Sequence, residues 1–175
     1  MMLGLDYLVD AWILSHRVAW LNPVMRLLSA FGKGGLGWIA VAALLTIVRR
    51  LSIAELLRMI LAIICTSLVI NWVIKPVVAR PRPFQRTAAV HVIGPRPHDS
   101  SFPSGHSGNA AAAAMVLSLF LPAARPLWWL LAAAIGYSRV YLGDHFPLDV
   151  LVGGAIGAAV GWMVARISVR SPGTV

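Results

Sequence analysis

Long apolar runs, separated by short polar or basic segments, dominate the chain. Four of these runs have the length of a membrane-crossing helix or come close to it, and they cover residues 55–79, 104–121, 127–142 and 146–167. A fifth run, over residues 36–48, is shorter, and the glycine-rich residues before it are expected to add a turn. The pattern therefore predicts a polytopic transmembrane bundle of about five helices.

The first 34 residues show a different pattern, in which apolar positions recur at helical spacing between charged residues. Pro23 would break or kink one long helix here, and the glycines of residues 32–37 predict a loop. We therefore expect short amphipathic helices at the membrane surface, with Trp12 and Trp20 in contact with lipid. The segment has no basic start followed by a clean apolar stretch and a cleavage site, so we do not expect a cleaved signal peptide.

Composition supports a membrane protein with one domain. Of the 175 residues, 59% are apolar and only 12% are charged, which lies outside the range of ordinary soluble domains and excludes disorder. The one cysteine, Cys65, excludes a disulfide scaffold, and no internal repeat is visible. We expect a single all-α domain over residues 1–175, with residues 1–34 as an interfacial region and residues 36–167 as the transmembrane core.

The net charge of +9 is compatible with a nucleic-acid partner. The basic residues are spread among apolar segments, however, and form no lysine-rich face or tail, so we expect none. In a membrane protein, basic residues hold loops on the cytoplasmic side. The alternation of spans places a group of arginines with the acid Glu55 on one face: Arg49, Arg50, Arg58, Arg125, Arg166 and Arg170. This face is predicted to be cytoplasmic and the opposite face extracytoplasmic.

Three separated segments are predicted to meet at the extracytoplasmic face. If the second span exits there, the long proline-rich loop of residues 80–103 lies on that face and the third span re-enters from it. The fourth and fifth spans then meet on the same face at residues 143–147. Long loops often carry function, and each of the three segments contains a cluster of polar residues.

The first cluster ends the second span with Lys75 and Arg82, seven positions apart. Lysine and arginine at helix ends often reach the membrane surface as anchors, and that alternative stays open for this segment alone. The neighbouring prolines, Pro76, Pro81 and Pro83, stiffen the backbone and fix where the cations point. Rigidly placed cations are suited to an anion site.

The second cluster, Ser104, Gly105 and His106, opens the third span. A hydroxyl and unpaired backbone N–H groups at a helix N-terminus can bind a phosphate, and the helix dipole supports this. The alternative is that Ser104 is only an N-cap and His106 only a surface histidine.

The third cluster consists of Arg139 at the end of the fourth span and of His145 and Asp149 at the start of the fifth. If the helix has begun there, a spacing of four lets the carboxylate bond one imidazole nitrogen and leaves the other nucleophilic. The alternative is a histidine whose hydrogen bonds are all made within the protein and an acid that caps the helix, with Pro147 in the first turn. We expect the neighbouring Asp144 to cap the fifth helix, with an effect on the local charge as the alternative.

Together the clusters supply three cations and a hydroxyl for a phosphate, two histidines for a nucleophile and an acid, and one carboxylate to orient a histidine. These residues are Lys75, Arg82, Ser104, His106, Arg139, His145 and Asp149. No group of carboxylates, cysteines and histidines has metal-binding spacing. We therefore predict metal-independent phosphoryl transfer without a cofactor.

These residues resemble the type 2 phosphatidic acid phosphatase superfamily, whose membrane members are lipid phosphatases and whose soluble relatives are vanadium haloperoxidases. The three signature motifs of that family are matched by Lys75 with Arg82-Pro83, by Pro103-Ser104-Gly105-His106, and by Ser138-Arg139 with His145 and Asp149. The motifs span residues 75–149, and the helices around them resemble the family from about residue 5 to residue 167. The family more usually has six spans, and this chain lacks a clear initial one.

The resemblance implies a role for each motif residue. His145 would attack phosphorus and form a phosphohistidine while Asp149 holds its ring. His106 would protonate the leaving oxygen and then help to activate water. The phosphoryl oxygens would be bound by Lys75, Arg82, Arg139, Ser104 and the backbone of Gly105.

The expected partners are a lipid phosphate and the cell membrane. The resemblance and the predicted orientation favour a polyprenyl diphosphate, such as undecaprenyl diphosphate, at the extracytoplasmic face. Phosphatidate or phosphatidylglycerophosphate, and a polyprenyl phosphosugar, are the alternatives, because the motifs are common to all three. A noncatalytic lipid-binding protein is less favoured, since both histidines and Asp149 are present. The sequence does not indicate an oligomeric state.

Other residues of the spans are expected to serve packing. Gly153, Gly157 and Gly161 recur at four-residue spacing, which permits close helix packing. Asn71 and Asn109 are expected to form hydrogen bonds between helices, with contact to substrate as the alternative.

Overall fold

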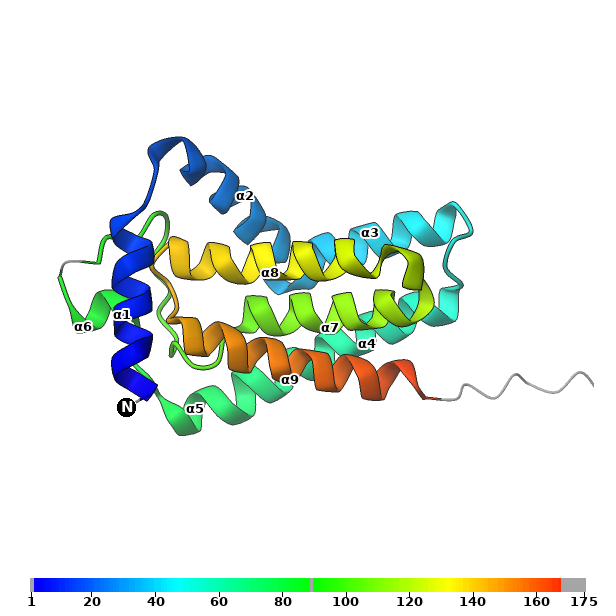
Figure 1. Ribbon diagram of the computed structural model, residues 1–175. Coiled ribbons are helices and arrows are strands. Elements are labelled where there is room, and N and C mark those ends of the chain that lie inside the picture. Colours follow the sequence, from blue (N-terminus) through cyan, green and yellow to red (C-terminus); the bar gives the residue numbers. More distant parts are fainter. Residues whose placement is uncertain (1, 89, 168–175) are drawn as a thin grey trace, which may run out of the picture.

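The computed structural model describes residues 2–88 and 90–167, and within these residues the chain is helical and contains no β-strand. Five helices lie side by side and form a bundle (Figure 1). They are α3 (Leu36–Ile47), α4 (Ile53–Leu68), α7 (Gly105–Phe120), α8 (Arg125–Tyr141) and α9 (Pro147–Ala165). Each helix lies in one of the five predicted apolar runs or within two residues of it, so the predicted all-α bundle is confirmed.

Helix α7 lies inside the bundle and packs against α4, α8 and α9. Its small residues Ala110–Ala114 are buried, which lets the neighbouring helices approach closely. On α9, a Cβ at Gly157 would overlap the backbone of Gly108, and a Cβ at Gly161 would lie 2.6 Å from the carbonyl oxygen of Ala112. The prediction that the glycine repeat permits close helix packing is confirmed.

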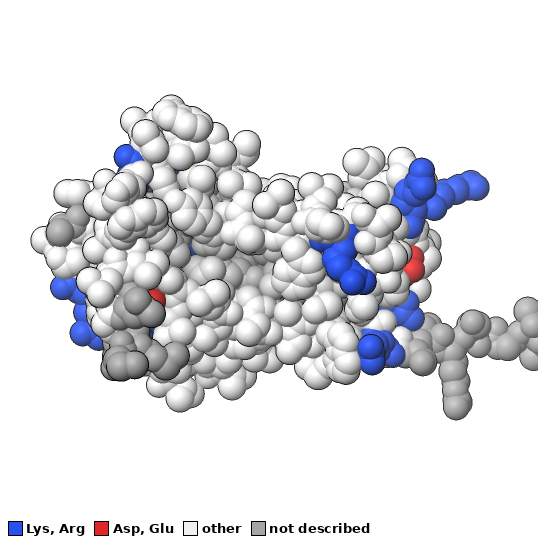
Figure 2. Space-filling model, viewed as in Figure 1, with Lys and Arg blue, Asp and Glu red and all other residues white. Residues whose placement is uncertain are grey.

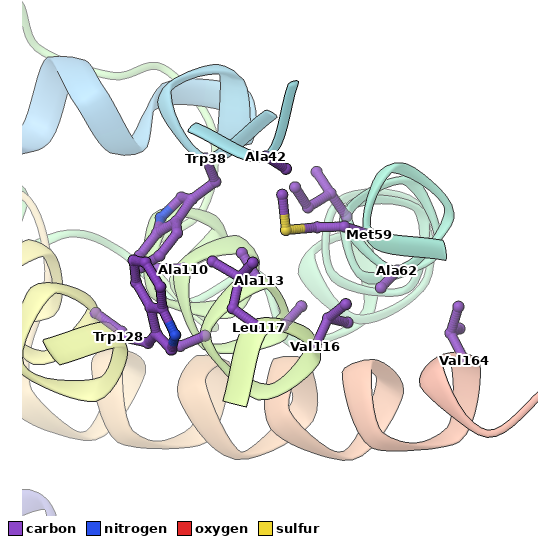
Figure 3. Close-up of a cluster of buried hydrophobic side chains, with 14 of the residues drawn as sticks. Trp38, Ala42, Met59, Ala62, Ala110, Ala113, Val116, Leu117, Trp128 and Val164 are labelled. Carbon is purple, nitrogen blue, oxygen red and sulfur yellow. The ribbon is translucent and has the colours of Figure 1, made fainter. Parts of the chain in front are cut away.

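Larger apolar side chains fill the space where α7 faces α3, α4 and α8 (Figure 3). Trp38 of α3, Met59 of α4 and Leu117 of α7 are at most 1% exposed, and Trp128 of α8 belongs to the same cluster. Met59, Leu117 and Trp128 all lie near the α3–α4 and α7–α8 connections. The apolar core is therefore concentrated toward that end of the bundle, and the opposite end is left for polar residues.

Helix α4 continues toward that opposite end. It passes through a π-helical turn, η3 (Val69–Ile74), into α5 (Lys75–Val78). The short helix α6 (Pro83–Arg86) and an irregular loop then lead back to α7. Because π-helical turns often occur at functional sites, the position of Asn71 and Lys75 in and after this turn is notable.

The N-terminal residues form two further helices. Helix α1 (Met2–Ser15) lies across one end of the bundle (Figure 1). After the short turn η1 (Ala19–Leu21), α2 (Asn22–Gly32) packs against α8 and leads to α3. Pro23 lies in the first turn of α2, so the chain breaks between α1 and α2, just before the proline.

The predicted loop at residues 32–37 is a kinked helical connection instead. The turn η2 (Lys33–Gly35) joins α2 to α3, and Gly34 and Gly35 have φ angles of 61° and 75°. Glycine reaches this region without the steric cost that a side chain would add. The chain therefore changes direction at the glycines while its helical path continues.

Within residues 2–88 and 90–167, three helical stretches are long and apolar enough to cross a membrane, namely Ala19–Ile47, Ile53–Arg86 and Pro147–Ala165. Helices α7 and α8, with 16 and 17 residues, are shorter. The first stretch begins inside the region that the sequence indicated to be interfacial. The division of the domain at residue 34 therefore stays a prediction.

Charged side chains are unevenly distributed. Figure 2 shows Lys and Arg side chains at both ends of the bundle, with a large group at the end that carries the α3–α4 and α7–α8 connections, and a broad uncharged band between the two ends. Arg49, Arg50 and Arg125 are exposed in these connections, and Arg166 follows α9. Arg170 lies outside the described residues. The assignment of the basic end to the cytoplasm stays a prediction.

Candidate active site

The three predicted clusters meet at the end of the bundle that α1 covers (Figure 1). They come from α5 and the segment after it, from the N-terminus of α7, and from the end of α8, the start of α9 and the connection between them. A pocket of about 220 Å³ opens there, and six of the predicted site residues line it: Lys75, Arg82, Gly105, His106, Arg139 and His145. The other two, Ser104 and Asp149, are fully buried and are not among its lining residues.

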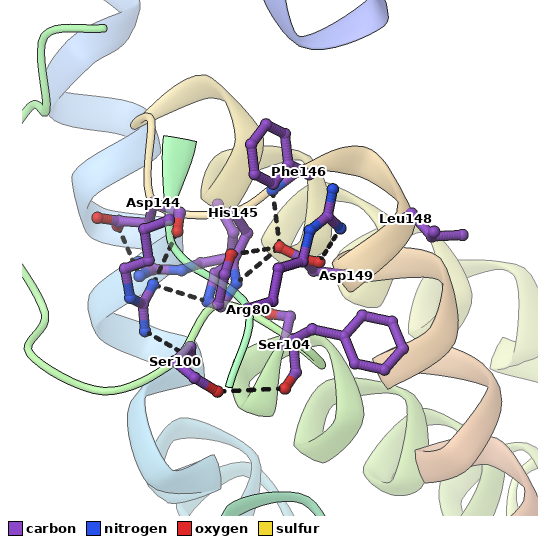
Figure 4. Close-up of polar contacts among 12 residues, drawn as sticks. Arg80, Ser100, Ser104, Asp144, His145, Phe146, Leu148 and Asp149 are labelled. Carbon is purple, nitrogen blue, oxygen red and sulfur yellow. Dashed lines mark hydrogen bonds and ion pairs between the residues drawn. The ribbon is translucent and has the colours of Figure 1, made fainter. Parts of the chain in front are cut away.

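His145 and Asp149 form a buried pair (Figure 4). His145 Nδ1 lies 3.6 Å from Asp149 Oδ2, which is within ion-pair range but longer than a hydrogen bond. The other imidazole nitrogen, Nε2, lies 3.4 Å from Arg82 Nη1. His145 precedes α9, which begins at Pro147, so the two residues do not lie on the same helical turn. The ring nevertheless has one nitrogen toward a carboxylate and the other toward a cation.

Three further donors hold the carboxylate of Asp149. Its Oδ2 accepts hydrogen bonds from the backbone N–H of Phe146 at 2.9 Å and from the hydroxyl of Ser101. Its Oδ1 accepts a hydrogen bond from Arg80 Nη1 at 2.5 Å. Because Phe146 is the N-cap of α9, Asp149 also caps the helix that carries it.

Burial and charge together keep His145 neutral. Burial lowers the pKa of the imidazole, Asp149 opposes this effect, and Arg82 and Arg139 reinforce it, so that the pKa is about 4. Asp149 favours a proton on Nδ1, which leaves a lone pair on Nε2 at neutral pH. This nitrogen can act as a nucleophile.

Arg139, at the end of α8, is oriented from two sides. Its Nη2 pairs with Asp144 Oδ2 at 2.6 Å, and its Nη1 donates to the hydroxyl of Ser29 on α2. The expectation that Asp144 caps α9 is therefore wrong, because its carboxylate pairs with a buried guanidinium and Asp149 caps the helix. Sequence analysis also missed Ser29, since nothing in the local pattern of α2 distinguishes it.

Lys75 and Arg82 point into the protein and are not membrane anchors, since they are 8% and 2% exposed. Arg82 donates from Nε to the carbonyl oxygen of Asp99 at 2.8 Å and from Nη1 to that of Asp144 at 2.7 Å. These bonds to the backbone fix the guanidinium at the wall of the pocket. The structure thus favours the anion-site interpretation of the first cluster.

The side chain of Asp99 contacts both of these cations, and sequence analysis missed it. Its Oδ1 lies 2.6 Å from Arg82 Nη2, and its Oδ2 pairs with Lys75 Nζ. Burial by itself would raise the pKa of Asp99, but the two cations outweigh burial and hold that pKa at about 2. The carboxylate therefore lies where two cations converge, as a phosphoryl oxygen would. A lone acid in the basic loop of residues 80–103 was the signal that could have identified it.

At the N-terminus of α7, the structure supports the alternative interpretation of Ser104. Its hydroxyl accepts a hydrogen bond from the backbone N–H of Ser107 at 3.4 Å, so Ser104 is the N-cap. Gly105 and His106 follow it and line the pocket. Within the described part of the chain, the imidazole of His106 has no hydrogen-bond partner, so it is available to a ligand.

Helix α1 reaches this site through Asp6 and Arg80, a contact that the sequence did not indicate. Arg80 pairs through Nη1 with Asp149 Oδ1 and through Nη2 with Asp6 Oδ2, and the distance is 2.5 Å in both pairs. Asp6 Oδ1 also accepts the backbone N–H of Leu148 at 2.8 Å. The guanidinium of Arg80 lies 4.1 Å from the centre of the Phe146 ring. α1 therefore turns an acidic side chain toward the bundle, where it shares a cation with Asp149.

Both asparagines of the spans line the pocket, and they differ in their contacts. Asn109 Oδ1 accepts a hydrogen bond from the hydroxyl of Ser67 at 3.0 Å, which joins α7 to α4 and confirms the predicted bond between helices. Asn71 lines the pocket beside Gly105, where a Cβ would lie 3.5 Å from Asn71 Oδ1. For Asn71 the structure favours contact with a ligand.

Comparison with models of known families matches residues 55–172 to the PAP2 superfamily. The chain belongs to this superfamily. The resemblance inferred from the three motifs is thereby confirmed, and the chain is a lipid phosphatase and an integral membrane protein.

Similar proteins support the assignment over nearly the whole chain. The undecaprenyl-diphosphatase of Sulfolobus acidocaldarius is 34% identical over 165 residues, which are 90% of this chain and 75% of the relative. The decaprenylphosphoryl-5-phosphoribose phosphatase of Mycobacterium tuberculosis is 36% identical over 143 residues, which are 81% of this chain and 77% of the relative.

Solved structures agree with the fold. LpxE of Aquifex aeolicus matches with a TM-score of 0.78 at 29% identity and covers 93% of this PAP2 chain and 95% of its own. A PAP2-type phosphatidylglycerolphosphate phosphatase from Bacillus subtilis matches with a TM-score of 0.73 at 29% identity, over 97% of this chain and 89% of its own.

Proposed function

We propose that this PAP2 phosphatase removes the terminal phosphate of a polyprenyl diphosphate through a phosphohistidine on His145, without a metal ion. The observation that carries the proposal is the orientation of the buried imidazole, with Nδ1 toward Asp149 and Nε2 toward Arg82 at the cationic pocket. A neutral histidine that is held by a carboxylate and faces an anion site is suited to nucleophilic catalysis.

In the first step, Nε2 of His145 attacks the terminal phosphorus, and a P–N bond forms as the bond to the lipid-side oxygen breaks. The electron pair of the broken bond leaves on that oxygen, and His106, which lines the same pocket, supplies a proton to it. The imidazole becomes positively charged, and Asp149 stabilises this charge. Because Arg80, Ser101 and the Phe146 backbone already hold the carboxylate, little reorganisation is needed.

The phosphoryl oxygens would be bound by Lys75, Arg82 and Arg139, with the backbone of Gly105 at the start of α7. The ion pairs of Asp99 with Lys75 and Arg82 would then break as these two cations bind the substrate. These side chains supply the positive charge that metal ions supply in other phosphatases. Within residues 2–88 and 90–167, no group of three or more His, Cys, Asp or Glu side chains could hold a metal ion.

In the second step, His106 takes a proton from water, and the resulting hydroxide attacks phosphorus from the side that the lipid has left. The P–N bond breaks, its electron pair returns to Nε2 of His145, and inorganic phosphate leaves. His106 starts protonated, gives that proton to the lipid product and regains a proton from water, and His145 returns to its neutral form, so both histidines end in their starting protonation states.

The polyprenyl diphosphate is supported by the similarity to an undecaprenyl-diphosphatase along 90% of the chain. Two alternatives come from the other relatives: a polyprenyl phosphosugar, and phosphatidylglycerophosphate. We further propose that the pocket faces the outside of the cell membrane, because the exposed arginines of the α3–α4 and α7–α8 connections and Arg166 after α9 lie at the opposite end of the bundle. Cysteine labelling in the loop of residues 90–100 tests this, and protection from membrane-impermeant reagents in intact cells would contradict it.

The chemistry is tested with detergent-purified protein in the presence of a chelator. Wild type, His145→Ala and a control variant of an exposed histidine, His91→Ala, are assayed with undecaprenyl diphosphate, phosphatidylglycerophosphate and phosphatidate. We expect the wild type and the control to release phosphate, fastest from the diphosphate, and His145→Ala to release none. Terminally labelled substrate should leave an acid-labile label on the wild type. A label that persists in His145→Ala would remove His145 as the nucleophile.

A further inference from the structure

A second and larger cavity, of about 760 Å³, lies next to the phosphoryl pocket. We call it the α2 groove. His106 and Arg139 line both the pocket and the groove, so the two spaces adjoin at these side chains. The proposed reaction takes place in the pocket, and none of its steps involves the groove.

One side of the groove is a single face of α2 and the turn that follows it. Arg26 and Ala30 line it at a spacing of four, which places them above one another on α2, and Lys33 lines it from the turn η2. Arg96 lines it from the loop that precedes α7. Apolar side chains complete the lining, among them Leu27. Apart from Arg139, the groove therefore combines three cations with an apolar surface.

These three cations are not neutralised by the protein. Among the described residues, no carboxylate forms an ion pair with Arg26, Lys33 or Arg96, and Arg96 lies over the ring of Phe84, 5.6 Å from its centre. Asp144 also lines the groove, but its carboxylate pairs with Arg139. An excess of positive charge at one concave surface favours an anionic ligand.

The position of α2 strengthens this argument. Arg26 and Lys33 belong to the stretch Ala19–Ile47, which is long and apolar enough to cross a membrane. A charged side chain in such a segment is costly unless it meets a partner or a ligand, and it commonly marks a functional site.

We propose that the α2 groove binds a second phosphoryl group of the substrate, the one that stays on the lipid after cleavage. This inference rests on the proposed function. His106, as the acid, must lie within hydrogen-bond distance of the leaving oxygen, which joins the transferred phosphoryl group to the leaving group. Since His106 also lines the groove, the leaving group extends into it.

The cleaved bond then joins the bridging oxygen to the terminal phosphorus. As this bond breaks and the P–N bond to His145 forms, the electron pair stays on the bridging oxygen of a lipid monophosphate. That product carries negative charge beside Arg26, Lys33 and Arg96. The alcohol released from a lipid monophosphate carries none. The groove therefore makes the enzyme selective for lipid diphosphates over monophosphates with the same tail.

The test uses farnesyl diphosphate and farnesyl monophosphate, which differ only in the second phosphoryl group. Initial phosphate release by the full chain in detergent gives the ratio of the two kcat/KM values, diphosphate over monophosphate. We expect this ratio to fall about tenfold in Arg26→Gln and further in Arg26→Gln/Lys33→Gln, since each variant loses a charge-assisted contact with the leaving phosphate. The control is Arg125→Gln, an exposed arginine at the far end of the bundle, which should keep the ratio.

The outcomes separate the inference from the proposed function. A wild type that hydrolyses the monophosphate but not the diphosphate would overturn both. If the wild type hydrolyses the diphosphate but the double variant has an unchanged ratio, the proposed role of the groove is overturned and the proposed function stands. This includes the case in which the rates with the diphosphate and the monophosphate fall equally. Thermal unfolding of each variant in detergent shows that the compared proteins are folded.

Discussion

Replacing Arg80 by glutamine would test whether α1 takes part in the active site. The substitution removes the cation shared by Asp149 and Asp6, which are 0% and 5% exposed. Two buried negative charges would then lose their common partner. Because removing one member of a buried ion pair costs about 3–5 kcal/mol, we expect the free energy of unfolding to fall by about that amount.

Activity should fall as well, through the position of Asp149. Without Arg80 the carboxylate keeps two of its three fixed donors, the Ser101 hydroxyl and the Phe146 backbone, and holds His145 less firmly. We expect kcat to fall about tenfold or more, which corresponds to roughly 1.4 kcal/mol of transition-state stabilisation. KM should change little, since Arg80 is not among the residues that line the pocket.

A double-mutant cycle with Asp6→Asn gives the decisive measurement. If Asp6 acts through Arg80, the effects of the two substitutions on unfolding are not additive, and the interaction energy is about 1–3 kcal/mol. Stability is followed by thermal unfolding in detergent and kcat by initial phosphate release. Arg86→Gln, at an exposed arginine of α6, is the matched control. Additive effects, or a wild-type kcat in Arg80→Gln, would refute the reasoning.

Three further predictions concern charge and packing. On its acid side, the pH profile of kcat/KM should fall as the pH drops through about 4, because burial keeps His145 unprotonated down to that pKa; an acid-side fall that begins near 6.5 would contradict this. Asp99→Asn should make inorganic phosphate a severalfold stronger inhibitor, because the carboxylate competes for Lys75 and Arg82; weaker inhibition would show that Asp99 orients the cations instead. Gly157→Val should lower the free energy of unfolding by about 3 kcal/mol through overlap with the α7 backbone, while Gly154→Ala, where a Cβ meets nothing within 4 Å, should leave it unchanged.

The sequence was sufficient for the architecture and for the types of residue at the site. Apolar runs predict helices because a chain in hydrocarbon must satisfy its backbone hydrogen bonds within each segment. The three motifs then indicated which ends of which helices meet, and the pocket is lined by most of the predicted residues. The predicted loop at residues 32–37 was wrong because Gly34 and Gly35 permit a helical kink as readily as a loop.

The partners of the motif residues were decided only by the tertiary structure. Asp99 meets Lys75 and Arg82 across a loop with no regular period, and Ser29 reaches Arg139 from a position 110 residues away. Asp6 lies 74 positions from Arg80 and looked like part of a surface helix. Its local sequence pattern is the same whether its side chain faces the membrane surface or a distant arginine. Periodicity and hydropathy are properties of neighbouring residues, so the sequence by itself determined the helices and the chemistry available. Ion pairs between distant segments depend on how those helices pack, and only the folded chain specifies that packing.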